Sequence, residues 1–317
     1  MTDNINNIDA EVAPEQPEKA KVMKEKDINT VSKKQKVMKV LVNIALYAFL
    51  SIMAVIVLFP FYWMLMSSVK TFDEYNATVP TLWPHQFRWE TYKLAFNRVS
   101  FGRVFLNTCF VGIVSTLLSL IITVLSAYAF ARFNFKGKNI LFAGLLATMM
   151  IPGELFTITN YITVVGWFKW DNTFTALIVP FLVSVFYIYL LRQNFMQIPN
   201  ELYLAAKVDG TSDLKYLWKV MIPLAAPTLI SITILKMMGS WNSYIWPNLV
   251  NSDTAHQLMT VALRSADYSY YVGTTSYGTD FPVQMAAVVL VTIPLLLVFL
   301  FFRKYIMRGV SRSGIKG

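Results

Sequence analysis

Residues 201–227 read ELYLAAKVDGTSDLKYLWKVMIPLAAP and separate two long apolar runs of the chain. Four small or apolar residues of the first half recur at near-helical spacing: Leu202, Ala205, Ala206 and Val208. Gly210 then stands where a helix would need a left-handed stop, and Ser212 and Asp213 supply a cap and a first-turn acid for a second helix. The stretch therefore predicts a helix-turn-helix, although an amphipathic loop resting on lipid headgroups would give a similar pattern.

The composition indicates a protein that crosses a membrane several times. Of the 317 residues 56% are hydrophobic and only 15% are charged, whereas a soluble domain has about 25% charged residues. The single cysteine, Cys109, excludes an internal disulfide. His85 and His256 have no second histidine or cysteine at metal-binding spacing, so we expect no structural metal site.

The net charge of +10 does not indicate nucleic-acid binding, because the basic residues collect beside the apolar runs instead of forming a stripe with aromatic residues. Residues 1–39 are rich in charged and polar residues and have almost no aromatic ones. Such a segment cannot bury enough apolar surface to fold, so we predict a disordered cytoplasmic tail over 1–39.

Six runs are long enough to span a bilayer, which needs roughly 20 apolar residues per helix. Four of them carry no charge: residues 40–69, 104–131, 172–191 and 281–302. Two others are each interrupted once, 139–168 by Glu154 and 220–252 by Lys236. The predicted fold is an all-α membrane protein with six transmembrane helices in one domain over residues 40–303.

The basic residues also predict the orientation, since basic loops stay on the cytoplasmic side. Lysine and arginine crowd the N-terminal tail, the turn after the second run and the C-terminal tail 304–317, so both termini are expected in the cytoplasm. The segment 199–222, between the fourth and fifth helices, then lies in the cytoplasm too. Residues 70–103 disagree, because they are predicted to lie outside and yet carry more basic than acidic residues.

Residues 201–227 resemble the EAA loop of ATP-binding cassette (ABC) importer permeases. Seven residues match its pattern in register: Ala205, Ala206, Asp209, Gly210, Ile222, Pro223 and Pro227. Within that family the chain is similar to the carbohydrate-importer, maltose-permease-like group. The stretches that carry this further resemblance are SSVKT (67–71), AYAFARFNFKGK (127–138), GSWNSYIWP (239–247) and SGIKG (313–317).

The resemblance implies coupling helices at this loop that dock into a cleft of a cytoplasmic ATPase. The residues expected to make that contact are Glu201, Leu204, Ala205, Ala206, Asp209 and Gly210. Leu204 departs from the family pattern, which has glutamate at this position, so we expect a more apolar contact here. Glu201 fits an acidic position just upstream.

The resemblance also implies the partners: a second homologous permease subunit, an ATPase dimer and an extracytoplasmic solute-binding protein. The chain has no phosphate-binding loop of its own, because the pair Gly137-Lys138 is followed by Asn139 and lacks the first glycine of the motif. It also lacks a nucleophile and base at catalytic spacing. We therefore expect no enzyme activity and no cofactor, with ATP and magnesium bound by the partner ATPase.

Glu154 and Lys236 are the two charges inside apolar runs, and a charge in the bilayer must face protein or water. Counted along straight helices they reach a similar depth, which permits an ion pair on a translocation path; each could instead snorkel or fill a packing gap. Pro152-Gly153 just before Glu154 predicts a break in the third helix.

The stretch GSWNSYIWP combines aromatic and hydrogen-bonding side chains, the mixture that holds a sugar ring. Trp241, Asn242 and Tyr244 are the candidates for the pathway, with Asn160 on the third helix. An interfacial aromatic belt is the alternative, and it suits Trp246 at least as well.

Together these features predict one permease subunit of an ABC importer for an oligosaccharide or related carbohydrate, in a bacterial inner (plasma) membrane. The alternative is an ion-coupled secondary transporter with Glu154 as its proton site. That alternative predicts inverted internal repeats, and no convincing repeat relates residues 40–165 to 172–303.

Overall fold

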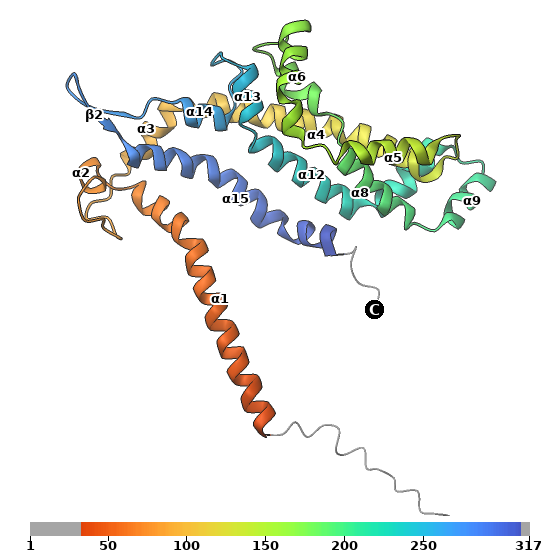
Figure 1. Cartoon of the computed structure of the whole chain (residues 1–317), viewed down its shortest axis with the longest axis horizontal. Coiled ribbons are helices and arrows are strands. Elements are labelled where there is room, and N and C mark those ends of the chain that lie inside the picture. The colour runs from red at the N-terminus through yellow and green to blue at the C-terminus, as the bar shows by residue number, and fades with distance from the viewer. Residues whose placement is uncertain (1–32, 312–317) are drawn as a thin grey trace, which may run out of the picture. The chain divides into compact units, whose positions relative to one another are not determined.

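The computed structural model describes residues 33–311, most of which are helical (Figure 1). Contacts divide the chain after Phe59 into two units, which are described one at a time. The expected tail lies mostly outside the described residues, as does SGIKG at 313–317.

The first unit consists of most of helix α1 (Lys33–Ser67), which continues past Phe59 into the second. This helix begins at Lys33, within the segment 1–39 that was predicted as a tail. No glycine or proline interrupts residues 33–59, and lysine has a good helix propensity, so the helix extends through the basic residues that precede the apolar run.

The second unit is built around the long helix α4 (Phe101–Arg132). It packs against α8 (Val185–Met196) and α12 (Ala226–Trp241), and α12 packs in turn against α15 (Phe281–Ser311) (Figure 1). Small residues make this close approach possible: a Cβ at Gly112 would lie 3.8 Å from Ser240 Oγ.

Shorter helices and turns connect and flank these long helices. They are α2 (Phe72–Tyr75), α3 (Glu90–Arg98), α5 (Lys138–Thr148), η1 (Gly153–Phe156), α6 (Thr157–Tyr161), η2 (Ile162–Trp167), α7 (Phe174–Ile178), η3 (Val179–Phe181), α9 (Asn200–Val208), α10 (Asp213–Tyr216), η4 (Leu217–Met221), α11 (Ile222–Leu224), α13 (Ile245–Val250) and α14 (Met259–Ser265).

Within residues 33–311, three helices are long and apolar enough to cross a membrane, and the number rises to six if each of three bent helix pairs is one span. The continuous spans are Val37–Ser67, Phe101–Arg132 and Phe281–Lys304. The predicted break at Pro152-Gly153 is confirmed, because the helical segments on its two sides meet at 86°.

Two of the other predicted spans also contain bends. Residues 172–191 bend by 46° between η3 and α8, where Pro180 interrupts the backbone pattern and Ser184 caps the new helix. The run 220–252 bends by 80° before α12, next to Pro227, and α12 ends at Trp241.

A hairpin of β1 (Ser269–Val272) and β2 (Thr275–Thr279) precedes α15, so the prediction of an all-α fold needs correction. Gly273 supplies the positive φ of its turn, 61°. Phe72 of α2 stacks on Tyr270 with the ring centroids 4.0 Å apart, which fixes the hairpin to the loop after α1. These strands were missed because tyrosine, serine and glycine here give no clear alternation.

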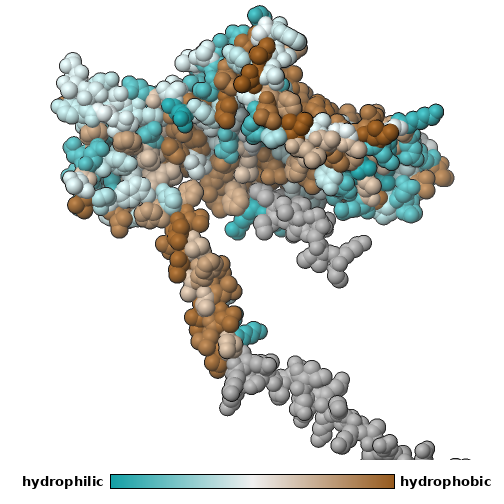
Figure 2. Space-filling model, viewed as in Figure 1, coloured by the Kyte–Doolittle hydropathy of each residue, from teal (hydrophilic) through white to brown (hydrophobic). Residues whose placement is uncertain are grey.

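Apolar side chains cover much of the middle of the second unit on the face seen in Figure 2, and polar ones gather at its two ends. The hairpin lies at one end and α9 at the other (Figure 1). An apolar belt between two polar ends suits a protein that spans a bilayer.

Candidate functional site

The helix-turn-helix predicted around Gly210 is present, and its turn is a Schellman motif. Gly210 has φ +68°, its N–H donates to the Lys207 carbonyl at 3.1 Å, and the Thr211 N–H donates to the Ala206 carbonyl at 2.8 Å. These bonds satisfy the last carbonyls of α9 and end it sharply. We call residues 199–222 the coupling segment.

Asp213, the first residue of α10, holds the two halves of the coupling segment together. Its carboxylate accepts hydrogen bonds from Lys207 Nζ at 2.8 Å and Tyr203 Oη at 2.9 Å, both on α9. It also accepts one from Tyr128 Oη, at 3.1 Å, on α4. One carboxylate therefore joins α9 and α10 to the central helix of the unit.

The ionisation of this cluster agrees with its geometry. The hydrogen bond from Lys207, followed by those from Tyr203 and Tyr128, holds the pKa of Asp213 below its usual value. The same bond to Asp213 raises the pKa of Lys207. Both groups are charged at neutral pH, and their pairing favours that state.

Arg132, at the end of α4, attaches the other end of the coupling segment. Its guanidinium donates to the carbonyls of Phe195 at 3.1 Å and Ile198 at 2.8 Å, and to Asn200 Oδ1 at 3.3 Å. Tyr216, buried at 1% exposure, packs its ring against that of Tyr203. The segment is thus attached to α4 and α8 at several points.

The surface of the coupling segment includes several large apolar side chains. Of the predicted contact residues, Glu201, Leu204, Ala205, Asp209 and Gly210 are exposed and Ala206 is half-buried. Five large apolar side chains of the segment are exposed, which we call the coupling patch: Leu202, Leu204, Val208, Leu214 and Trp218. Val208 is 87% exposed. Exposed apolar residues on one segment can form a binding surface.

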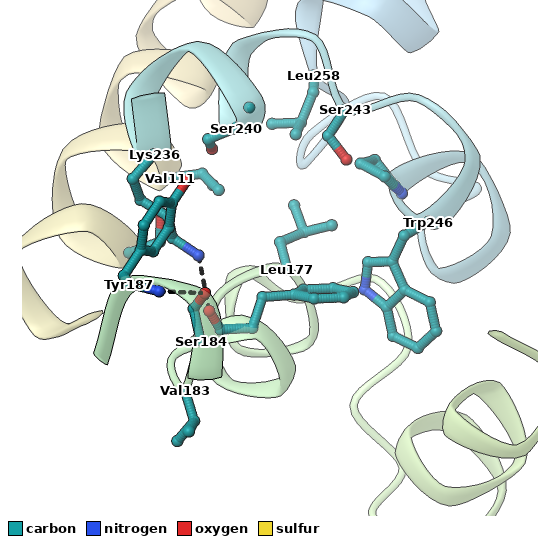
Figure 3. A pocket seen from close by; sticks show the side chains of 14 residues that line it. Val111, Leu177, Val183, Ser184, Tyr187, Lys236, Ser240, Ser243, Trp246 and Leu258 are labelled. Carbon is teal, nitrogen blue, oxygen red and sulfur yellow. Dashed lines mark hydrogen bonds between the residues drawn. The ribbon is translucent and has the colours of Figure 1, made fainter. Parts of the chain in front are cut away.

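A second candidate site is a cavity of about 360 Å³ among α4, η3, α8, α12 and α13 (Figure 3). Hydroxyl groups and one cation are among its lining groups: Ser115, Ser184, Tyr187, Lys236, Ser240 and Ser243. In Figure 3, Lys236 lies on the same side as Ser240, and Trp246 closes another side.

Lys236 and Trp246 both bind backbone carbonyls at the edge of the cavity. Lys236 Nζ donates to the Phe181 carbonyl at 2.7 Å, at the bend between η3 and α8. Trp246 is 7% exposed, and its Nε1 donates to the Ala176 carbonyl at 2.9 Å. The break in the helix thus provides carbonyl acceptors that an unbroken helix would use itself.

The structure does not form the ion pair that the sequence permits between Glu154 and Lys236. Glu154 is exposed on η1, and no ion pair joins the two side chains in the described part of the chain. Glu154 and Lys236 would reach a similar depth only along straight helices, and the helix pair that carries Glu154 bends by 86°.

The other predicted pathway residues lie outside this cavity. Trp241 packs edge-on against Phe105, with the ring centroids 5.9 Å apart. Asn242 is exposed after the end of α12, and Asn160 is half-buried on α6. Tyr244 lies beneath the Arg264 guanidinium, 5.3 Å from its ring centroid.

Sequence reasoning missed most of the residues that form the cavity, including Ser184 and the face of α12 that continues from Lys236. Lys236, Gly239 and Ser240 stand at helical spacing, which could have identified a polar face on this span. Trp246, for which an interfacial aromatic belt was the alternative interpretation, closes one side of the cavity.

The bent spans, the coupling segment and the cavity between helices define a membrane transport subunit. Residues 119–312 match the family described as "Binding-protein-dependent transport system inner membrane component". Because the match covers more than half of the chain, the protein belongs to this family. It is a permease subunit of an ABC transporter.

Individual relatives are similar in sequence to this chain over most of their own length. The chain is 29% identical to the arabinooligosaccharides transport system permease protein AraQ of Bacillus subtilis (strain 168), over 87% of this chain and 96% of the relative. It is 29% identical to the diacetylchitobiose uptake system permease protein NgcG of Streptomyces coelicolor, over 84% and 87%. A bacterial ABC transporter involved in alginate import shares the fold, with a TM-score of 0.75 and 24% identity over 86% of this chain and 98% of that one.

Proposed function

We propose that this protein is one of two permease subunits of a bacterial ATP-driven importer for an oligosaccharide or related carbohydrate. A solute-binding protein delivers the sugar on the outer side, and an ATPase dimer in the cytoplasm drives the transmembrane helices between two states. A second, homologous permease completes the translocation path. ATP and magnesium bind to the ATPase and not to this chain.

The coupling segment carries the proposal. An exposed apolar patch at Leu204 and Val208, fixed to α4 through Asp213 and Arg132, can transmit movement only if another protein holds it. A cleft in the ATPase is the partner that the family suggests. Leu204, in place of the family's glutamate, would contribute apolar contact there.

The proposed topology has six spans, three of which are continuous helices. The N- and C-termini and the coupling segment lie on the cytoplasmic side, and the hairpin of β1 and β2 lies outside, where the binding protein docks. The position of the hairpin and α9 at opposite ends of the second unit supports this arrangement (Figure 1).

The carbohydrate substrate is supported by two observations. The cavity combines several hydroxyl groups with Trp246, a mixture suited to a polar ring with apolar faces. Two of the relatives carry saccharides, arabinooligosaccharides and diacetylchitobiose, in their names. Glu154, Asn160, Trp241, Asn242 and Tyr244 remain proposed pathway residues outside this cavity.

Reconstitution tests the proposal. The chain, its partner permease and the ATPase are placed in proteoliposomes with the binding protein outside, and uptake of labelled oligosaccharides is measured with ATP inside. We expect uptake only when all components and ATP are present. A matched ATPase that cannot hydrolyse ATP should abolish it.

An ion-driven mechanism predicts a different result. Uptake by this chain without the ATPase, driven by a proton gradient and lost in Glu154→Gln, would contradict the proposal and favour a secondary transporter.

A further inference from the structure

Lys236 is a cation in the middle of a candidate span, on the wall of the cavity. It is half-buried on α12, eleven positions after Ala225, where the 80° bend precedes the helix. A lysine within a span is costly unless it faces protein, water or an opposite charge, so its partner has to be identified.

The cavity provides no opposite charge. None of its 14 lining residues is aspartate or glutamate, and the other side chains that border it are hydroxyl, aromatic or aliphatic. Glu154, the other charge within an apolar run, is exposed on η1 and forms no ion pair with Lys236 in the described residues.

Among residues 33–311, Lys236 Nζ has one neutral acceptor, the Phe181 carbonyl at 2.7 Å. An ammonium group has three N–H donors, so two more can point into the cavity. A neutral donor such as glutamine could bind the same carbonyl at a lower desolvation cost. The positive charge itself is therefore better explained by something that enters the cavity.

We infer that Lys236 makes this cavity a recognition site for an anionic saccharide, one that bears a carboxylate or another acidic group. This inference rests on the proposed function. The ammonium binds the acidic group, while the hydroxyls of Ser184, Ser240 and Ser243 and the ring of Trp246 lie around the sugar. A volume of about 360 Å³ is at the lower end of ligand pockets, enough for part of an oligosaccharide.

The charge of Lys236 also attracts an anionic ligand before the ligand touches the cavity wall. A cavity with a single sign of charge and poorly polarisable walls concentrates the field of that charge, so it attracts anionic ligands and repels cationic ones. The inference therefore predicts selectivity by charge in addition to selectivity by ring shape.

The test uses two probes that differ only in charge: trigalacturonate and its fully methyl-esterified, neutral form. Equilibrium binding of each is measured to the purified complex of both permeases and the ATPase, without the binding protein, so that its selectivity does not contribute. We expect the wild-type complex to prefer the acidic probe by about tenfold or more, the equivalent of 1.4 kcal/mol.

Three variants separate charge recognition from structural support. Lys236→Met should remove the preference and leave binding of the neutral probe unchanged, whereas Lys236→Arg should keep the preference. Lys93→Met, an exposed lysine on α3, is the matched control and should behave as the wild type. Size-exclusion profiles and ATPase rates show that each complex is assembled.

Several results would overturn the inference. They are no binding of the acidic probe to the wild-type complex, equal binding of both probes, or a preference that persists in Lys236→Met. A loss of stability in Lys236→Met with an unchanged preference would assign Lys236 to supporting the Phe181 carbonyl. If the reconstituted importer takes up saccharides but is indifferent to their charge, this inference fails and the proposed function stands; if it takes up none, both fail.

Discussion

Asp213 shows how much one side chain can contribute to the coupling segment. Its carboxylate receives three hydrogen bonds from α9 and α4, although its backbone position is only the start of a short helix. Removing the charge should loosen α9 from α4 while leaving the coupling patch itself intact.

We predict that Asp213→Asn separates ATP hydrolysis from transport. The amide can accept fewer hydrogen bonds and carries no charge for Lys207, so the segment can move without moving α4. In proteoliposomes the sugar transported per ATP hydrolysed should fall about three- to tenfold, with the ATPase rate largely retained. Asp171→Asn, on an exposed turn, is the control; an unchanged transport ratio in Asp213→Asn would contradict the role of this cluster.

The depressed pKa of Asp213 also gives a pH dependence. Its folded-state pKa is below its unfolded value of about 3.9, so its contribution to stability is fully present above that pH. The contribution is lost as pH falls through the lower, folded-state pKa. The difference in melting temperature between wild type and Asp213→Asn should be constant above about pH 5 and shrink below about pH 4; a difference that grows on acidification would refute this assignment.

For single residues, the sequence predicted the position in a helix better than it predicted the hydrogen-bond partners of the side chain. Asp213 was expected as a first-turn acid, which it is. Its bond to Tyr128 joins residues 85 positions apart, and a pairing of that kind depends on how α4 and the coupling segment pack. The same limit applies to Lys236, whose acceptor lies 55 positions away.

Among the elements, the turn at Gly210 has the clearest physical requirement. Its φ of +68° lies in the left-handed region, and no atom lies within 4 Å of the place where a Cβ would be. Any effect of a side chain there is therefore conformational strain and not a clash.

Gly210→Ala should destabilise the coupling segment by roughly 1–2 kcal/mol, the cost of the left-handed region for an L-residue with a Cβ. Hydrogen exchange of the α9 amides should become faster. Gly210→Asn is the matched variant, because asparagine tolerates this conformation, and its exchange should stay closer to wild type. Equal exchange in all three proteins would argue against a strained turn.

The close contact between α4 and α12 leads to a second prediction about elements. A Cβ at Gly112 would meet Ser240 Oγ at 3.8 Å, an ordinary contact, so Gly112→Ala should be tolerated. Gly112→Leu should force the helices apart and cost about 1–3 kcal/mol. Thermal unfolding in detergent measures both, and a leucine variant as stable as the alanine one would show that this interface can adapt.

The helix breaks show what the sequence could and could not predict about elements. Pro152-Gly153 combines two residues that disrupt helices, and the break there was predicted correctly. Pro180 lies within a charge-free run and has no glycine beside it, so the bend before Ser184 was missed. Whether a helix bends at a single proline depends on whether other residues donate hydrogen bonds to the carbonyls that lose their helical partners, as Lys236 does for Phe181.

For the whole molecule, hydropathy and basic residues led to six spans and an orientation. The structure is consistent with between three and six spans, since a bent pair can be one span or a re-entrant loop. Orientation depends on the surrounding membrane, so a chemical measurement has to decide it.

The single natural cysteine makes that measurement simple. In a Cys109→Ser background, Thr275→Cys on β2 should react with a membrane-impermeant maleimide in intact cells. Val208→Cys, on the coupling segment, should react only after the membrane is opened. The reverse pattern would invert the proposed topology, and labelling of both in intact cells would place the two ends on one side.

The 80° angle between the end of the coupling segment and α12 determines the direction in which force can act. In the proposed mechanism, a pull on the segment along its own axis would be nearly perpendicular to α12 and would tilt that helix instead of sliding it lengthwise through lipid. Lys236 and Ser240 lie on α12, whereas Ser184 caps α8. A small movement of the coupling segment outside the bilayer would then change the width of the cavity, while each apolar helix stays at the same depth in the membrane.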